Sequence, residues 1–510
     1  MSSQHLDRLS SVDASFLHQE DGRDSHMHIG GIGIFEGPPP SEDDLLAHIG
    51  GRLKLVPRFR QKLVAAPLRS GRPLWTDDPR FSLGYHVRRT ALPKPGTEQQ
   101  LMRLISRVHS QRLDRTKPLW EMWIIEGLTD DRWAVLTKTH HALVDGVGGI
   151  DIMTALLDLS PVSRRVGPDD WHASREPSFV DLLERGISGA VRNAREVSGQ
   201  MLGRALNPRR TAEEVLERAL GLAELARLTI SPAPPTPLNH SPGPHRDFAV
   251  VRAEVADFKA VKDALGGTLN DVVLAVVSGA LRRFLDDYGC PVDTMRLRAC
   301  VPMSVRTSDQ AGGLGNRIVI MVAELPIDIA DPVARLREVS RHMDGLKSSR
   351  QAVAAQTMVQ MEQWMPPNVL AQASRIGFSS RLYNLLVTNV PGPQFPVYLL
   401  GRRMSEVFPI AFLAPEHTLA IAILSYDGSV NVGLLGDADA EHDLGSLADY
   451  IRRSLQELLA AARPPADAEP AKRSPAKKSA ARTAAKKSTS RTAKKAAGSG
   501  RPAGPLEAGR

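Results

Sequence analysis

The pattern of apolar and polar positions predicts a chain that mixes strands with helices. Residues 26–35 (HMHIGGIGIF), 133–139 (WAVLTKT), 248–255 and 296–301 have the short, partly alternating pattern of strands. Residues 268–285 (TLNDVVLAVVSGALRRFL) are long enough for a helix and apolar around most of its circumference, which predicts a buried helix. Strands and helices that follow one another along the chain predict an α/β fold.

Polar residues mark where helices are expected to begin. Ser41 stands before three acidic residues and an apolar pattern, so we expect it to cap a helix. Thr268 and Asp271 have the spacing of a capping box. A final amphipathic helix is predicted over residues 442–462, with Asp443 near its start.

Changes in composition divide the chain into parts. Residues 231–245 (SPAPPTPLNHSPGPH) hold six prolines, which predicts an extended crossover between two halves. The first half, 1–230, ends in a polar segment, 161–230, that we expect to be helical. The second half is 246–462. Residues 463–510 are rich in Ala, Lys, Arg, Ser and Pro and hold no aromatic residue, which predicts a disordered tail.

The net charge of +8 is concentrated in this tail. Residues 471–510 carry twelve Lys and Arg and one Glu, a charge of +11, whereas the other 470 residues carry 53 basic and 56 acidic side chains. The high isoelectric point therefore describes the tail and gives no reason to expect a nucleic-acid-binding core. For the tail we expect attraction to anionic lipid, where each Lys or Arg contributes roughly 1 kcal/mol. Nucleic acid, through its phosphates, and a solvated extension without a partner are the alternatives.

Several classes of protein are disfavoured. Two cysteines, Cys290 and Cys300, are too few for a disulfide framework or a Cys-rich metal site. The sequence shows no secretory segment and no apolar run long enough to cross a bilayer, so we expect a cytoplasmic protein with at most peripheral membrane contact. The phosphate loop, the dinucleotide fingerprint, the nucleophile elbow and the H-E-x-x-H zinc motif are absent from the sequence, which disfavours the commonest enzymes that carry them.

One segment carries candidate chemistry, because a strand-like run ends in His140 and His141. Asp145 follows four residues after the second histidine, and Gly146 comes next. Histidine is well suited to take a proton near neutral pH, a carboxylate can hold the loop, and glycine allows a tight turn. A metal site is disfavoured, since no Cys or Glu cluster completes it. The plainer alternative is two core histidines and a turn aspartate.

The pattern His-His-x-x-x-Asp-Gly at 140–146 is the signature of the CoA-dependent acyltransferase superfamily, which includes chloramphenicol acetyltransferase, the plant BAHD enzymes and the condensation domains of nonribosomal peptide synthesis. Further segments occur in a consistent order: Leu9–Glu20 (LSSVDASFLHQE), 118–120 (PLW), 237–239 (PLN), 243–246 (GPHR), 269–273 (LNDVV), 302–306 (PMSVR), 315–316 (GN) and 389–393 (NVPGP). Over about residues 5–462 the sequence resembles the bacterial wax ester synthase/diacylglycerol acyltransferase family.

The resemblance implies a fold and an activity. The fold would be two related chloramphenicol-acetyltransferase-like α/β domains, joined by a crossover, with an active-site tunnel between them. The activity would be an O-acyltransferase that moves a long-chain fatty acyl group from acyl-CoA to diacylglycerol or to a long-chain alcohol. Coenzyme A would enter as the acyl carrier, with no metal or other cofactor. Such substrates suggest peripheral contact with the inner face of the membrane or with lipid droplets.

The resemblance also implies roles for the residues of the motif. His141 would be the general base and His140 a supporting residue. Asp145 would hold the motif loop by pairing with an arginine, for which Arg306 is a candidate, and Gly146 would allow the turn.

Three residues outside the motif are candidates for substrate contact. Asn270 could donate to the oxyanion of the tetrahedral intermediate, and a local capping role is its equally weighted alternative. Trp120 could line the acyl path, although ordinary packing is the interpretation we prefer. Asn316 matches a family segment without an evident chemical role.

Two other functions stay open at this stage. One is a condensation-type acyl transfer to another alcohol or to an amine. The other is a noncatalytic lipid-binding protein that keeps the motif by descent.

Overall fold

The computed structural model describes residues 7–20, 24–65, 72–143, 152–164, 166–167, 169–182, 231–304, 318–347, 377–440 and 442–463. Residues 1–463 form one unit and residues 464–510 another. The tail lies outside the described residues, so its disorder and its affinity for lipid stay predictions.

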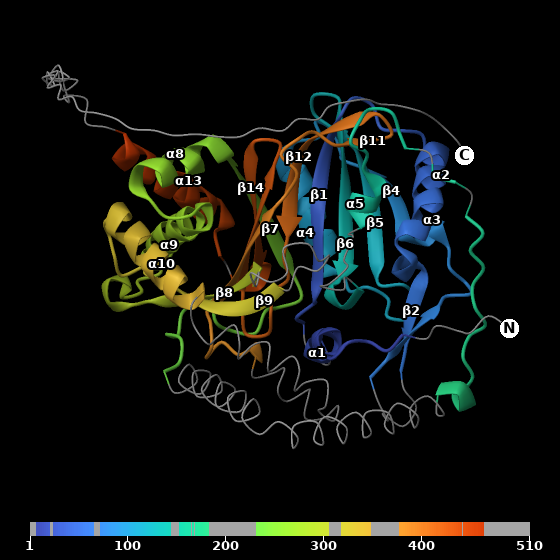
Figure 1. Cartoon of the computed structure of the whole chain (residues 1–510), viewed down its shortest axis with the longest axis horizontal. Coiled ribbons are helices and arrows are strands. Elements are labelled where there is room, and N and C mark those ends of the chain that lie inside the picture. Colours follow the sequence, from blue (N-terminus) through green and yellow to red (C-terminus); the bar gives the residue numbers. More distant parts are fainter. Residues whose placement is uncertain are drawn as a thin grey trace, which may run out of the picture. The chain divides into compact units, whose positions relative to one another are not determined.

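Two six-stranded sheets form the centre of the first unit (Figure 1). The strands of the first sheet follow the order β11 (Tyr398–Leu399), β12 (Arg402–Ile410), β1 (His28–Glu36), β6 (Arg132–His140), β5 (Trp120–Leu128) and β4 (Val87–Ala91). The strands of the second follow the order β7 (Arg246–Glu254), β14 (Ser429–Asp437), β13 (Leu419–Tyr426), β10 (Leu385–Pro391), β8 (Leu297–Ser304) and β9 (Ile318–Leu325). Both sheets are mixed, since β4 runs parallel to β5 and β10 runs parallel to β8 and β13. A separate antiparallel pair is formed by β2 (Gln61–Val64) and β3 (Leu74–Asp77).

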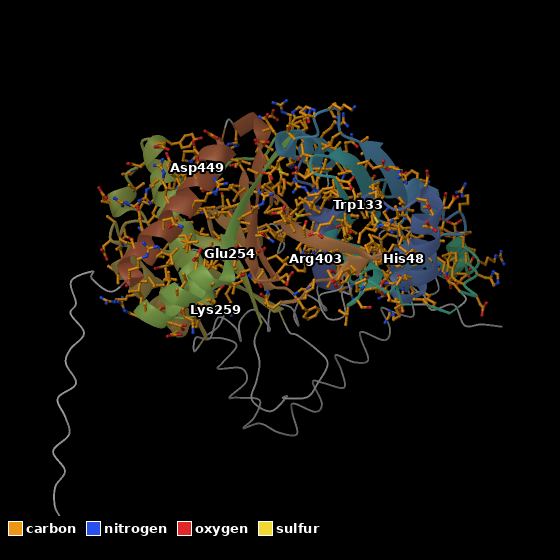
Figure 2. All side chains as sticks on the ribbon, turned by 90° about the horizontal axis from the view of Figure 1, so that it is seen from above. His48, Trp133, Glu254, Lys259, Arg403 and Asp449 are labelled. Carbon is orange, nitrogen blue, oxygen red and sulfur yellow. The ribbon has the colours of Figure 1, made fainter. Side chains whose placement is uncertain are left out.

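Helices flank the sheets. The described α-helices are α1 (Ser11–Glu20), α2 (Glu42–Arg52), α3 (Leu83–His86), α4 (Glu98–Ser110), α5 (Ile152–Leu156), α8 (Val255–Leu265), α9 (Leu269–Asp287), α10 (Pro332–Lys347) and α13 (Leu444–Ala462). Short 3-10 helices are η1 (Leu53–Leu55), η2 (Pro57–Arg60), η4 (His141–Leu143), η5 (Val292–Thr294) and η7 (Ala438–Ala440). Helices α8, α9, α10 and α13 pack together beside the second sheet, whereas α4 packs between the first sheet and β7 (Figure 1). Figure 2 views the same arrangement from above, with Trp133 in the half that holds the first sheet and Asp449 in the half that holds the second.

The elements and caps predicted from the sequence are confirmed. The four expected strands correspond to β1, β6, β7 and β8, and the buried helix is α9. Ser41 accepts the backbone N–H of Asp44 and caps α2. Thr268 and Asp271 form the expected capping box.

The pairing of β12 with β1 was not predicted. Strand β12 comes from the second half of the chain, yet it pairs antiparallel with β1 and also packs against β13 and β14. One hydrophobic cluster therefore contains side chains from both sheets, among them Ile32, Leu136, Phe248 and Leu435. The two halves thus share a sheet and a core, and the domain boundaries drawn from composition stay an interpretation.

The expectation of a helical segment over residues 161–230 is wrong for the described residues up to 178. The described residues from 161 to 178 contain no helix, and one begins only at residue 179. Prolines at positions 161, 168 and 177 explain this, because each removes a backbone donor and restricts the residue before it. Residues 183–230 lie outside the described residues.

The crossover has neither helix nor strand over residues 231–245, as its prolines predicted. A reciprocal amide pair attaches it to the second sheet. Nδ2 of Asn384 donates to Oδ1 of Asn239 at 2.8 Å and to the carbonyl of Pro234 at 2.7 Å, and Nδ2 of Asn239 donates to the carbonyl of Asn384 at 3.0 Å.

Among the described helices, none alone has the length and apolar character needed to cross a membrane. The consecutive helices α8 and α9 meet these criteria only when taken together, and they are bent by 100° where they join. Most of α9 is buried in the core.

Candidate active site

His141 lies where β6 ends and η4 begins. Its backbone N–H donates to the carbonyl of Met27 at 2.8 Å. Its ring stacks on Phe16 of α1, with centroids 4.1 Å apart and planes inclined by 25°. Phe412 meets the same imidazole edge-on, at a centroid distance of 5.5 Å. Two phenyl rings therefore fix the orientation of the imidazole and shield it from water.

The protonation state of His141 follows from this setting. Burial, with a smaller contribution from His140, lowers the pKa of His141 to about 4, against a lesser rise from a hydrogen bond with the backbone of His141 itself. The residue keeps partial contact with solvent, but its Nδ1 is fully buried and has no partner on another described residue. A neutral imidazole keeps a lone pair on one ring nitrogen, so His141 can accept a proton at neutral pH.

His140 faces charge where His141 faces aromatic rings. Its backbone N–H donates to the carbonyl of Leu119 at 2.9 Å, and its Nδ1 accepts the backbone N–H of Ala142 at 3.0 Å. Its Nε2 lies 3.2 Å from Oε1 of Glu20. Since Nδ1 accepts a hydrogen bond, this ring carries a hydrogen on Nε2, which lies 3.2 Å from the carboxylate without the geometry of a hydrogen bond. These contacts fit the supporting role predicted for His140.

Glu20 ends α1 and is a buried, ionised carboxylate. Oε1 accepts the backbone N–H of Met27 at 2.6 Å, and Oε2 accepts from Nη2 of Arg115 at 2.8 Å. Burial alone would raise the pKa of Glu20, but His140, Arg115 and the Met27 hydrogen bond together lower it to about 2. Glu20 therefore places a fixed negative charge beside the first histidine of the motif.

Three further buried histidines lie in this part of the molecule: His26, His28 and His109. The ring of His28 is 5.4 Å from that of His26 and 5.8 Å from that of His140, and its Nε2 is 3.7 Å from Glu20. Burial, followed by neighbouring positive charges, lowers the pKa of His26 to about 4 and the pKa values of His28 and His109 well below the usual range. All three are neutral at pH 7.

Asn270 lies in the first turn of α9, and its Oδ1 accepts from Nδ2 of Asn389, in β10, at 3.1 Å. The capping contacts of this turn are made by Thr268 and Asp271, so the capping alternative for Asn270 is not supported. None of the hydrogen bonds, ion pairs and ring contacts among the described residues joins Asn270 to His140 or His141. Its contribution to an oxyanion site stays a prediction.

The contacts of Trp120 are those of a core residue. Its indole N–H donates to the carbonyl of Phe59 at 2.7 Å, and its ring stacks on His86 at 4.7 Å. Only 1% of its surface is exposed. Packing is therefore the better interpretation of Trp120.

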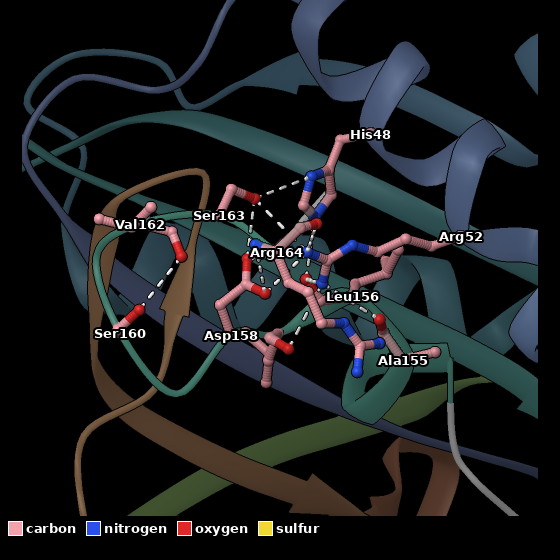
Figure 3. Close-up of polar contacts among 10 residues, drawn as sticks. His48, Arg52, Ala155, Leu156, Asp158, Ser160, Val162, Ser163 and Arg164 are labelled. Carbon is pink, nitrogen blue, oxygen red and sulfur yellow. Dashed lines mark hydrogen bonds and ion pairs between the residues drawn. The ribbon is translucent and has the colours of Figure 1, made fainter. Parts of the chain in front are cut away.

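A buried ion pair anchors the segment that follows the motif (Figure 3). Nη2 of Arg52, on α2, donates to both carboxylate oxygens of Asp158, at 2.7 and 2.9 Å. Nη1 of Arg52 donates to the carbonyls of Ala155 and Leu156, which end α5. Nε2 of His48, one turn earlier on α2, also contacts the carbonyl of Leu156 at 2.9 Å. Helix α2 thereby holds the chain soon after the motif loop.

Two cavities have volumes of about 230 and 360 Å³. The first is lined by Lys62, Asp78, Arg80, Thr116 and Lys117. The second is lined by Ser231, Pro232, Pro234, Pro291, Thr294, Met295, Arg296, Arg298 and Glu324. Neither set includes a histidine of the motif, so the tunnel between the halves stays a prediction. Within the described part of the chain, no three His, Cys, Asp or Glu residues are grouped to hold a metal ion.

Family models match most of the chain. The model of the wax ester synthase/diacylglycerol acyltransferase catalytic domain matches residues 9–273, and that of the WS/DGAT C-terminal domain matches residues 314–459. A probable diacylglycerol O-acyltransferase of Mycobacterium tuberculosis is 32% identical over 460 residues, which cover 89% of this chain and 96% of the relative. The chain belongs to the wax ester synthase/diacylglycerol acyltransferase family. It is an acyltransferase, as its resemblance to this family implied.

Solved structures agree with this membership. The wax ester synthase/diacylglycerol acyltransferase from Marinobacter aquaeolei VT8 matches with a TM-score of 0.61 and 27% identity, over 89% of this chain and 100% of that one. Trichothecene 15-O-acetyltransferase from Fusarium sporotrichioides matches with a TM-score of 0.57 over 90% and 95% of the two chains, and its 12% identity shows the fold alone. The α/β fold expected of a wax ester synthase/diacylglycerol acyltransferase is confirmed.

Four predicted site residues of this acyltransferase lie outside the described residues. They are Asp145, Gly146, Arg306 and Asn316. The proposed pairing of Asp145 with Arg306, the turn at Gly146 and any contact of Asn316 with substrate therefore stay predictions.

Sequence reasoning missed three residues that contact the two motif histidines: Phe16, Glu20 and Phe412. Phe16 and Glu20 belong to the family segment Leu9–Glu20 and lie four residues apart, which is a helical spacing that could have indicated a shared face. Phe412 follows β12, and nothing in its local sequence indicates that this strand joins the first sheet.

Proposed function

We propose that this protein transfers a long-chain fatty acyl group from coenzyme A to the hydroxyl of diacylglycerol or of a long-chain alcohol, with His141 as the general base. The observation that carries the base assignment is the neutral imidazole of His141, held between Phe16 and Phe412 with its Nδ1 buried. Because Nδ1 is buried, we assign the acceptance of the substrate proton to Nε2.

The proposed reaction balances without a covalent acyl-enzyme. Nε2 of His141 takes the hydroxyl proton while the alcohol oxygen bonds to the thioester carbonyl carbon. The tetrahedral intermediate then collapses, the carbon–sulfur bond breaks, and His141 returns the proton to the departing sulfur. Ester and coenzyme A thiol leave, and His141 is again neutral. The proposal uses no resident cofactor.

The intermediate places a negative charge on the former carbonyl oxygen, which a hydrogen-bond donor would stabilise. Asn270 is our candidate, because its Oδ1 is occupied by Asn389 and its own amide N–H groups are then oriented away from that partner. The aromatic residues around His141 support acyl transfer over hydrolysis, since they limit the access of water to the base.

The acyl acceptor and the basic tail both suggest that the enzyme acts at a lipid surface. Diacylglycerol and long-chain alcohols collect in membranes and lipid droplets, and a tail of charge +11 suits an anionic surface. We therefore propose peripheral contact with such a surface.

The test is an acyl-transfer assay with labelled palmitoyl-CoA and diacylglycerol, hexadecanol or no acceptor. We expect labelled triacylglycerol or wax ester from the wild type. His141→Ala should lower kcat by about 10²- to 10⁴-fold, the usual contribution of a general base. Asn270→Ala should lower kcat by about 10²- to 10³-fold, as expected for one oxyanion donor.

The matched control is His86→Ala, which also removes a buried histidine stacked on an aromatic ring, here that of Trp120. It should keep kcat close to the wild-type value if it folds, as judged by circular dichroism. A His141→Ala variant with near-normal kcat would overturn the base assignment. Absence of product with both acceptors would overturn the proposed substrates and point to another alcohol, an amine or a lipid-binding function.

A further inference from the structure

The family segment Leu9–Glu20 has no chemical role in the proposal above, yet it forms the helix nearest to the motif histidines. Ser10 directly precedes α1, and its Oγ accepts the backbone N–H of Asp13 at 3.0 Å. Phe16 and Glu20 are four residues apart on this helix and so lie on one face.

That face contacts the two histidines separately. Phe16 stacks on the ring of His141 at 4.1 Å, and Oε1 of Glu20 lies 3.2 Å from Nε2 of His140. Nη2 of Arg115 donates to Oε2 of Glu20 and also to the carbonyl of Leu17, at 3.1 Å. The carboxylate is therefore fixed to its own helix while it contacts the histidine.

Glu20 is also linked to the backbone of His141. The N–H of Met27 donates to Oε1 of Glu20 at 2.6 Å, and the carbonyl of the same Met27 accepts the N–H of His141 at 2.8 Å. A second link runs through His140, whose Nδ1 accepts the N–H of Ala142 on the far side of the base. The backbone is thus held on both sides of His141.

We propose that Glu20 is a positioning residue for catalysis: its carboxylate keeps the proton of His140 on Nε2, so that Nδ1 of His140 holds Ala142 and the turn that presents His141. The inference rests on the proposed function of His141 as the base. A proton on Nδ1 instead would remove the acceptor for Ala142 and place two donors against each other.

Glu20 should therefore affect the placement of the His141 ring and leave the pKa of His141 unchanged. Burial and His140 account for the lowered pKa of His141, and Glu20 is not among its causes. Loss of the carboxylate should therefore lower kcat and leave the acidic limb of the pH profile where it is. Glu20 touches no atom of the proposed reaction centre, so substrate affinity should be spared.

Glu20→Gln is the test, because it keeps the size and one acceptor oxygen but removes the charge. We expect kcat to fall by about 10- to 100-fold, the usual cost of losing a group that orients a reactive side chain. The KM for palmitoyl-CoA should stay within about twofold of the wild-type value. In ¹⁵N-histidine NMR spectra at neutral pH, His140 should be the Nε2–H tautomer in the wild type and lose that single form in the variant.

The matched control is Glu121→Gln. Both carboxyl side chains are 7% exposed, but that of Glu121 pairs with Arg88 at 3.1 Å and accepts from Trp123. The control should keep kcat within about twofold and leave the His140 tautomer unchanged.

The outcomes separate the two proposals. If the wild type forms no ester, or His141→Ala stays active, the proposed function fails whatever Glu20→Gln does. If His141→Ala is inactive but Glu20→Gln keeps its kcat, the positioning role is wrong. An Nδ1–H tautomer of His140 in the wild type would also overturn it, even if the variant does not fold.

Discussion

Two adjacent histidines at the end of β6 have different surroundings, and the different surroundings give them different roles. His140 faces the carboxylate of Glu20, whereas His141 lies between the rings of Phe16 and Phe412. His140 ends the strand and His141 begins η4, so the backbone changes its path between the two residues and their side chains meet different surroundings. The pair can therefore combine one residue that holds the turn with one that takes the proton.

The low pKa of His141 predicts an unusual pH profile for kcat/KM. A base works when it is deprotonated, so activity is lost only as the pH falls toward the pKa of about 4. We expect kcat/KM to stay flat from about pH 8 to about pH 5.5, where a histidine with the ordinary pKa of about 6.5 would be mostly protonated.

Initial rates with palmitoyl-CoA and hexadecanol, measured across this range on enzyme whose folding is checked at each pH, give this profile. A tenfold loss of kcat/KM between these limits would contradict the prediction and show that the base titrates as an ordinary exposed histidine.

The sequence indicated the two histidines but not what surrounds them. His140 and His141 stand out because their spacing to Asp145 and Gly146 is distinctive. Glu20 and Phe412 are about 120 and 270 residues away from His141 in the chain, so contacts with them depend on tertiary folding, which local patterns do not encode.

At the scale of elements, α2 connects three segments through one side chain. Arg52 joins the end of α5, the carboxylate of Asp158 and the carbonyl of Arg164 at 3.1 Å. Asp158 in turn exchanges two backbone hydrogen bonds of 2.8 Å with Tyr398 of β11. An interior arginine is suited to such a position, because its planar group donates in several directions at once.

Arg52→Met should destabilise the protein strongly. It leaves the carboxylate of Asp158 buried without its cation, a change that costs about 3–5 kcal/mol of unfolding free energy. Urea unfolding followed by circular dichroism would measure the loss. In the control Arg132→Met, the lost pair with Asp130 is more exposed and should cost about 0–1 kcal/mol. Equal losses of unfolding free energy in the two variants would show that the buried ion pair stabilises the protein no more than the exposed one.

Helices and strands could be predicted where the sequence signal comes from residues that are close together in the chain. The caps at Ser41, Thr268 and Asp443 and the apolar pattern of α9 depend on residues within a few positions of one another. The helix expected after residue 160 is absent from the described residues up to 178, because prolines at 161, 168 and 177 oppose a helix there despite the polar composition. The place of β12 in the first sheet has no local signal, since the same strand pattern would suit either sheet.

At the scale of the molecule, the buried, positively charged Arg246 lies where the two halves of the chain meet. Arg246, the first residue of β7, donates its backbone N–H to Oγ of Ser110 at the end of α4, at 2.8 Å, and donates from its guanidinium to the backbone carbonyl of Asp24. Burial is the main cause of the lowered pKa values of His26 and His109, and the positive charge of Arg246 lowers them further. The same junction therefore joins the halves and keeps these histidines neutral.

This junction should make the protein sensitive to mild acid. The pKa values of His26, His28 and His109 are depressed in the folded state, so the unfolded chain binds more protons below its ordinary histidine pKa. Their contribution is complete above about pH 6.5 and is lost as the pH falls through the lowered pKa values, about 4 for His26, by up to about 1.4 kcal/mol per pH unit for each histidine. The contribution of Glu20, whose pKa is about 2, is lost only below its unfolded value of 4.5.

Urea unfolding at about pH 7 and about pH 5 separates these groups, because the carboxylate stays ionised in the folded protein over this window. We expect a clear fall in the free energy of unfolding, and a smaller fall in His109→Gln, which has one fewer histidine to protonate on unfolding. An unchanged free energy between the two pH values would mean that the buried histidines take up protons without unfolding. The same slope in His109→Gln and the wild type would mean that His109 is not among the groups that cause it.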